Sequence, residues 1–292
     1  MGAMRAGLVA LVVAGLAAVS CKSGGGGSPA AGCPAVEDDL ISDFLVDNSL
    51  HAADGRQGGW YAYGDDLGTF AFPGKFEIDA TQGNTNCSGP GSLHFKGMGF
   101  AMYGAATGVD WKPRPSDGDG GYADKMTYDA SKYRGIAFWA KASAPLDGVQ
   151  VSFPDLYTDG AAPSHDMPDP TNPTNPPLCM ASDGTCRCIY NGASALNCSP
   201  YLVQFGRTGD AAADTVFAGY ASYRLETTWK RFQVLFVDSR QDPGNGGYHT
   251  PDDRLSVDKL TAMAIQINAD YSTGSAKARD FDVWIDDVYF IK

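Results

Sequence analysis

Alternation of apolar and polar side chains along short segments constrains the fold of this chain more than any other feature. The clearest runs are 149–153 and 229–237, and three further runs lie at 134–141, 260–268 and 281–291. Alternation places successive side chains on opposite faces of a β-strand, whereas an amphipathic helix needs a period of about 3.6 residues. The runs are rich in β-branched and aromatic residues, which favour strands. Only 255–264 also fits a short helix, so we expect an all-β fold.

Turn-forming residues separate these runs. The chain holds 36 Gly and 17 Pro, and Asp and Asn are frequent between the strand segments. Many short strands with such punctuation indicate a β-sandwich or a jelly roll. Three segments, 110–124, 157–200 and 240–254, are expected to be long loops, which are commonly functional. No internal repeat is visible, and residues 35–292 are predicted to form one domain.

The N-terminus has the features of an export signal. Arg5 precedes an apolar run at 7–18, and Ala18-Val19-Ser20 then leads to Cys21. This order predicts a signal peptide over 1–20 and lipidation of Cys21, with plain secretion after nearby cleavage as the alternative. The Gly- and Ser-rich segment 21–34 is expected to be a flexible tether. We therefore predict a lipid-anchored protein of the cell envelope, at the outer membrane or cell surface, that contacts the membrane only through its anchor.

The cysteines are expected to form disulfides, because an exported chain meets an oxidising compartment. Six of the seven cysteines remain once Cys21 carries lipid. Cys33 and Cys87 are left to pair with each other, and four more crowd one loop. One intervening residue is too short for an unstrained bridge, so each of the two central members should reach an outer one. The loop members are Cys179, Cys186, Cys188 and Cys198, for which a zinc site is the alternative.

Charge excludes one class of partner. The formal net charge is −12, and loss of Arg5 with the signal makes the mature chain one unit more negative. A nucleic-acid partner would require a basic patch, so none is expected. The acidic residues are almost all Asp, which suits loops and can also ligate hard cations.

Polar side chains opposite the apolar ones form a candidate binding face. In the predicted strands they are amides, a hydroxyl and a guanidinium, which together supply donors and acceptors for sugar hydroxyls. An ordinary solvated sheet face is the alternative. The residues are Gln150, Ser152, Arg231, Gln233 and Gln266.

Aromatic rings form a second set of candidates, because sugar rings stack their C–H faces on flat aromatic surfaces. Trp111 lies in the most polar surroundings and is the predicted exposed platform. Core packing is expected for three other tryptophans, Trp139, Trp229 and Trp284. The remaining candidates are Trp60, Tyr61, Tyr63, Tyr122 and Tyr157.

Catalytic motifs are absent from the sequence. It has no Gly-x-Ser-x-Gly elbow, no His-Glu-x-x-His and no phosphate-binding loop. Its four histidines lie far apart without companion motifs. A pair of aspartates acting as a glycosidase stays open, since the chain has many Asp and none is marked.

Four segments in order resemble carbohydrate-binding modules with the galactose-binding-like β-sandwich, family 11 most of all. They are Leu40-Ile-Ser-Asp-Phe-Leu-Val-Asp47, the segment 128–141, Thr228-Trp-Lys-Arg-Phe-Gln-Val-Leu-Phe236 and Phe281-Asp-Val-Trp-Ile-Asp-Asp-Val-Tyr-Phe290. The resemblance implies a jelly-roll sandwich that binds a glycan without catalysis. The chain departs from the family at Leu45, where a Glu is usual, and in its larger cysteine-bearing loop.

The same resemblance implies a structural calcium ion between the first and last strands. The matching carboxylates are Asp43 and Asp286, with Asp287 beside the latter. Calcium prefers several oxygen ligands, and Leu45 removes one donor. The alternative is that these aspartates only end a strand in solvent.

The resulting hypothesis is a surface lipoprotein that binds a polysaccharide or cell-wall sugar without catalysis. A structural or adhesive lipoprotein with a protein partner is the alternative, and a glycoside hydrolase with an unmarked Asp pair is the third. An aromatic groove with amide lining would favour sugar, a flat apolar patch would favour protein, and two carboxylates facing across a cleft would favour hydrolysis.

Overall fold

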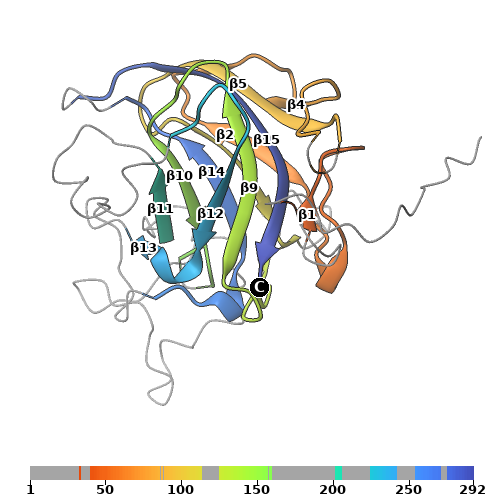
Figure 1. The fold of residues 1–292 in the computed structure, drawn as a ribbon. Coiled ribbons are helices and arrows are strands. Elements are labelled where there is room, and N and C mark those ends of the chain that lie inside the picture. Colours follow the sequence, from red (N-terminus) through yellow and green to blue (C-terminus); the bar gives the residue numbers. More distant parts are fainter. Residues whose placement is uncertain are drawn as a thin grey trace, which may run out of the picture.

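Two antiparallel β-sheets lie face to face as two layers (Figure 1). The computed structural model describes Cys33 and residues 40–85, 87, 89–113, 125–156, 158–159, 201–205, 224–241, 254–270 and 275–292. Within these residues the helical pieces are single 3₁₀ turns, η2 (Ala53–Gly55), η3 (Phe236–Asp238) and η4 (Val257–Lys259). The predicted all-β sandwich is confirmed, and the short helix that 255–264 also allowed is reduced to one such turn.

The first layer is a seven-stranded sheet built around its longest strand, β15. β15 pairs with β9 on one side and with β5 and β1 on the other. β12 extends the sheet beyond β9, while β3 and β4 pair with β5. The strands are β1 (Leu40–Ser42), β3 (Thr69–Phe70), β4 (Phe76–Asp79), β5 (Ser92–Phe100), β9 (Gly135–Ala142), β12 (Lys230–Leu235) and β15 (Arg279–Ile291).

The second layer is a six-stranded sheet with the order β13-β11-β10-β14-β6-β2. Its strands are β2 (Trp60–Gly64), β6 (Ala105–Asp110), β10 (Val149–Phe153), β11 (Tyr201–Phe205), β13 (Arg240–Gln241) and β14 (Ala262–Ile267). A separate ribbon pairs β7 (Lys112–Pro113) with β8 (Lys125–Met126). In Figure 1, β9, β12 and β15 belong to one layer and β10, β11 and β14 to the other.

The hydrophobic core fills the space between the sheets. Val151 and Ile265 reach it from the six-stranded sheet, and Phe138, Val283 and Ile285 from the other, each at most 2% exposed. These are the apolar members of the alternating runs, so alternation within each strand decides which side chains face the other sheet. Full burial of such a side chain stabilises the fold by about 1.5–3 kcal/mol.

One predicted disulfide lies within the described residues. Cys33 and Cys87 are bonded, which confirms that pairing and fastens the chain before β1 to the loop after β4. Cys21, the four loop cysteines, Tyr122 and Tyr157 lie outside the described residues. In the described part of the chain, no helix is long and apolar enough to cross a bilayer.

Candidate functional site

A groove of about 290 Å³ lies on the outer face of the six-stranded sheet. Its floor is made of small side chains, because Ala264 on β14 is paired with Gly108 on β6 and with Ser152 on β10. A Cβ atom on Gly108 would lie 2.6 Å from the Met263 carbonyl oxygen, so this close approach requires glycine. The lining residues are Tyr61, Tyr63, Lys125, Ser152, Pro154, Thr158, Asp159, Ala262, Met263, Ala264 and Gln266.

The strand register arranges the groove in two parallel rows. One row runs Tyr61–Gly108–Ala264–Ser152 and the next runs Tyr63–Ala106–Gln266–Gln150. Each row therefore starts with an aromatic side chain on β2 and crosses small side chains; the first ends in Ser152 on β10, and the second in Gln266 on β14 and Gln150 on β10. Three inter-strand spacings separate β2 from β10, or roughly 14 Å. An aromatic wall thus faces a polar wall across a flat floor.

The aromatic wall consists of Tyr61 and Tyr63, and a hydrogen bond to Asp110 fixes its Tyr61 end. The Tyr61 and Tyr63 rings lie 6.1 Å apart at 30° to each other. The Tyr61 hydroxyl donates a hydrogen bond of 3.0 Å to Asp110 Oδ1, while Tyr63 is 37% exposed. Burial raises the pKa of both hydroxyls, and the negative charge of Asp110 raises the pKa of Tyr61 further, so both hydroxyls stay protonated donors.

A partly buried ion cluster closes the Asp110 end of the groove. Lys125 Nζ lies 3.0 Å from Asp110 Oδ1 and 3.1 Å from Asp159 Oδ2. Burial acts to lower the pKa of Lys125, but the two carboxylates outweigh it and raise the pKa above its ordinary value. Thr261 Oγ1 also donates to Asp159 Oδ2, at 2.6 Å. The lysine ammonium therefore occupies the space between the two carboxylates.

Amide side chains form the opposite end. Gln266 Nε2 donates to the Tyr103 carbonyl oxygen at 2.9 Å and to Asn268 Oδ1 at 2.8 Å. Asn268 Nδ2 in turn donates to Gln150 Oε1 at 3.0 Å. The structure thus brings the predicted Gln150, Ser152 and Gln266 together on one sheet face.

Two members of the predicted polar face lie elsewhere. Arg231 and Gln233 are on β12 of the seven-stranded sheet, where Arg231 donates to the Tyr289 hydroxyl and to Gln233 Oε1. The prediction of one shared face is therefore wrong for these two. Alternation tells which side of its own strand a residue occupies, but it does not tell which sheet receives that strand.

The predicted aromatic platform is also wrong. Trp111 is fully buried and packs against Tyr128 and Phe290. It follows Asp110 and keeps the alternation of β6, so it turns into the core despite its polar neighbours in sequence. Trp60 is 2% exposed and its Nε1 donates to Ser42 Oγ at 3.0 Å.

Three tryptophans predicted in the core are instead half-buried. Trp229 and Trp284 enclose the Lys141 ammonium, which lies 5.0 and 5.1 Å from their ring centroids. The other face of Trp284 is stacked on His94 at 4.3 Å. Both faces of Trp284 are therefore covered. Trp139 has a similar intermediate exposure.

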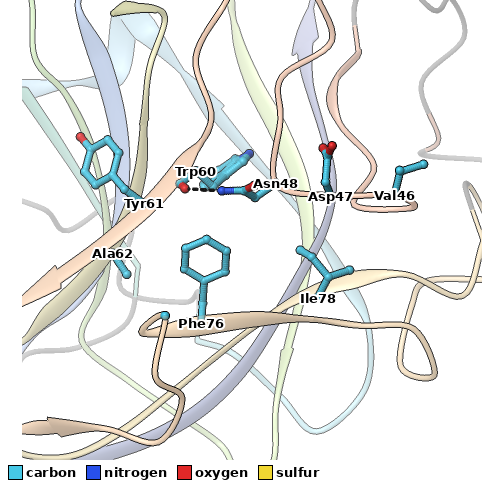
Figure 2. A pocket seen from close by; sticks show the side chains of 9 residues that line it. Val46, Asp47, Asn48, Trp60, Tyr61, Ala62, Phe76 and Ile78 are labelled. Carbon is cyan, nitrogen blue, oxygen red and sulfur yellow. Dashed lines mark hydrogen bonds between the residues drawn. The ribbon is translucent and has the colours of Figure 1, made fainter. Parts of the chain in front are cut away.

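A second hollow, a cleft of about 620 Å³, opens where the edge of β2 faces β4. Figure 2 shows Phe76 and Ile78 pointing from β4 toward Trp60 and Asn48. The Asn48 amide donates to the Trp60 carbonyl oxygen at 2.8 Å, and Val46 at the rim is 88% exposed. The cleft is larger than the groove but is lined mainly by apolar side chains, so the groove is the better candidate for a polar ligand.

The predicted metal carboxylates meet an unpredicted asparagine. Asp286 and Asp287 are fully buried; the Asn84 backbone N–H donates to Asp286 Oδ2 at 2.6 Å and its amide donates to Asp287 Oδ2 at 3.1 Å. Burial raises the pKa of Asp286 to about 8, and the charge of Asp287 contributes. The buried Asn84 Oδ1 has no hydrogen-bond donor in the described part of the chain.

Asp43, the third predicted carboxylate, lies near enough for its negative charge to raise the pKa of Asp286. Its carboxylate lies 3.4 Å from His51 Nε2 and accepts the Leu45 backbone N–H at 3.3 Å. Among the described residues, no three His, Cys, Asp or Glu side chains are grouped so as to hold a metal ion. A site at Asp286 and Asp287 would therefore depend on Asn84 and other oxygens, which no sequence motif marks.

Comparison with known proteins gives likenesses of fold only. No family profile and no curated protein matches the chain. The similar solved structures include carbohydrate-binding modules. A family 11 module of a cellulosomal cellulase of Clostridium thermocellum has 11% identity and a TM-score of 0.39, with 86% of this chain and 95% of that chain covered. A family 30 module of another cellulosomal cellulase from that organism has 10% identity and a TM-score of 0.41, with 87% and 96% covered.

An agarase is also similar, at 8% identity and a TM-score of 0.35; the match covers 87% of this chain but only 26% of the agarase. The resemblance to carbohydrate-binding modules that the sequence indicated is thus confirmed, because modules of families 11 and 30 are among the similar structures.

Proposed function

We propose that this protein binds a neutral glycan in the outer-face groove and performs no chemistry on it. The observation that carries the proposal is the facing of an aromatic wall, Tyr61 and Tyr63, and a polar wall, Ser152 and Gln266, across a flat floor. A pyranose has C–H faces that pack on aromatic rings and hydroxyls that both donate and accept. Small-molecule sites commonly combine apolar surface with a few placed polar groups in this way.

Tyr63 is the stacking residue in this proposal. It is exposed, whereas the neighbouring Tyr61 is fixed by its bond to Asp110. Burying a fixed ring costs little conformational entropy, so a sugar docked against this pair gains aromatic contact at small cost.

The charge of the groove favours a neutral sugar. Lys125 is the cation at the groove, and two carboxylates already compensate it. An anionic sugar would meet one excess negative charge and the general acidity of the chain.

The same ion cluster argues against hydrolysis. A glycosidase needs a space for the glycosidic bond, and for water, between its two carboxyl groups. Between Asp110 and Asp159 that space holds the Lys125 ammonium. We therefore propose binding without catalysis.

Affinity electrophoresis and calorimetry test the proposal. The panel is soluble β-1,3-1,4-glucan, xyloglucan, xylan and agaro-oligosaccharides, with alginate as the charged member. Tyr63→Ala should weaken binding about tenfold, equivalent to about 1.4 kcal/mol. Trp229→Ala removes an aromatic side chain directly before β12 of the opposite sheet and should leave affinity unchanged. Equal binding by Tyr63→Ala and wild type would rule the groove out.

A protein partner is the second candidate function, and the apolar cleft of Figure 2 favours it. Exposed Val46 stands beside Phe76 and Ile78 there. If the folded protein bound no glycan of the panel, a protein partner at this cleft would be the better supported function.

We further propose that the chain is exported and held at the cell envelope through lipid on Cys21. The support is the order of signal peptide, cysteine and Gly-rich tether in the sequence. A tether would let the sandwich reach insoluble glycan while the anchor stays in the membrane.

Calcium binding at the buried carboxylates is the last proposal. The fit rests on the buried Asn84 Oδ1, which has no hydrogen-bond donor in the described part of the chain, beside the Asp286 and Asp287 carboxyl groups. Carboxylate and amide oxygens are the ligands a hard cation prefers. Asp286, Asp287 and Asn84 would hold the ion, whose positive charge would offset two buried negative ones.

A further inference from the structure

The amide chain across the groove end has a defined direction. It is anchored on the Tyr103 carbonyl oxygen, which can only accept, so the group that contacts it at 2.9 Å must be the Gln266 NH₂. The same nitrogen lies 2.8 Å from Asn268, which must therefore present its oxygen. The Asn268 nitrogen then faces Gln150, whose oxygen accepts at 3.0 Å. Each amide orientation follows from the one before it.

This direction determines what the groove offers to a ligand. The Gln266 nitrogen donates within this series of amide hydrogen bonds, so its Oε1 stays available as an acceptor. The Gln150 oxygen accepts within the series, so its Nε2 stays available as a donor. In the described part of the chain, neither remaining atom has another hydrogen-bond partner. Gln150 and Gln266 are directly opposite each other in the β10–β14 register, on the same sheet face. The lining residue Gln266 and the adjoining Gln150, which is 7% exposed, thus present one acceptor and one donor side by side.

We infer that Asn268 is a positioning residue that sets this acceptor–donor pair and with it the ligand preference of the groove. The inference rests on the proposed glycan function. The matching ligand presents two neighbouring hydroxyls, one donating to Gln266 Oε1 and the next accepting from Gln150 Nε2, as a vicinal diol of a pyranose does. Asn268 itself need not touch the sugar.

Asn268→Asp tests the inference with almost no change of shape. An aspartate still accepts from the Gln266 NH₂, but its second oxygen repels Gln150 Oε1, so the Gln150 amide must turn and donate. The groove then presents two acceptors. Gln150→Glu gives the same outcome by another route, because one carboxylate oxygen accepts from Asn268 and the other faces the ligand. Gln233→Glu, exposed on the opposite sheet, controls for the added charge.

The first readout needs no sugar. In side-chain amide NMR spectra, the Gln266 and Asn268 NH₂ protons of the wild type should exchange more slowly with water than those of Gln150. In Asn268→Asp the Gln150 NH₂ should become protected. Protection of Gln150 in the wild type, unchanged in the variant, would overturn the inference whether or not any glycan binds.

The second readout is calorimetric titration with soluble β-1,3-1,4-glucan and with agaro-oligosaccharides. For whichever of these the wild type binds, Asn268→Asp and Gln150→Glu should each weaken binding about tenfold, while Gln233→Glu should not. Unchanged affinity in both variants, with the NMR change present, would show that the amide pair does not contact the sugar and would refute the proposed role. Absence of binding by wild type to all glycans would instead refute the proposed function.

Discussion

Two carboxyl groups buried side by side make the Asp286–Asp287 pair the most informative place to perturb this protein. Asp287→Asn removes one charge while keeping the shape of the side chain. Asp287 has a φ of 47°, a region that asparagine adopts more readily than most residues. The oxygen of the new side chain can still accept from the Asn84 amide, as Asp287 Oδ2 does. The substitution therefore changes the electrostatics of the cluster with little change of its packing.

The magnitude follows from the pair itself. Burial first, and the Asp287 charge second, raise the pKa of Asp286 to about 8, against about 4 in the unfolded chain. Because the folded pKa is the higher one, the folded protein binds more protons between these values. The bound proton on Asp286 therefore adds to the free energy of unfolding. This contribution is full below about pH 4 and is lost as the pH rises through about 8, and it amounts to at most about 6 kcal/mol. For scale, two unit charges at roughly 5 Å and an effective dielectric constant of about 20 repel by about 3 kcal/mol, which is the part of this loss that removing the Asp287 charge would relieve.

Urea unfolding in a chelator and in calcium measures the effect. In chelator at about pH 9, Asp287→Asn should be more stable than wild type by up to about 3 kcal/mol, and its stability should fall less steeply from about pH 5. In calcium the wild type should be the more stable of the two. Calcium stabilises the folded state by binding to it, and the variant has lost one of the carboxylates that hold the ion. Asp66→Asn, an exposed carboxylate, controls for net charge. A variant less stable than wild type by the same amount in both conditions would refute this reasoning.

Three further predictions concern other parts of the molecule. Lys125→Met leaves Asp110 and Asp159 facing each other without a cation, so urea denaturation should show a loss of about 2 kcal/mol; an unchanged midpoint would contradict the ion cluster. Trp111→Phe should cost about 1 kcal/mol by lost packing, and since the ring is buried its glycan affinity should equal that of wild type in calorimetry; altered affinity would restore Trp111 as a platform. Mass spectrometry of the mature chain should find lipid on Cys21, and non-reducing peptide maps should find two bridges in the cysteine-rich loop; a chain still joined to Ser20, or four free thiols, would refute these. The loop cysteines are Cys179, Cys186, Cys188 and Cys198.

Much of the candidate site could be predicted because alternation is a local property. Gln150, Ser152 and Gln266 had to oppose the buried Val151 and Ile265, whatever the strands paired with. The pairing of Cys33 with Cys87 followed from the crowding of the other cysteines. For Trp111, polar neighbours outweighed the strand period in our prediction, and the period was the better guide.

The sequence by itself determined which side of each strand would be buried, and so the all-β class and the apolar core, because side-chain direction in a strand depends only on position along it. Only the tertiary structure decided which strands became neighbours. That choice separated Arg231 from Gln150, set Tyr63 in a row with Gln266, and brought Asn84 to Asp287 across more than two hundred residues of sequence. Strand partnering depends on long-range contacts between whole faces, which no single strand encodes.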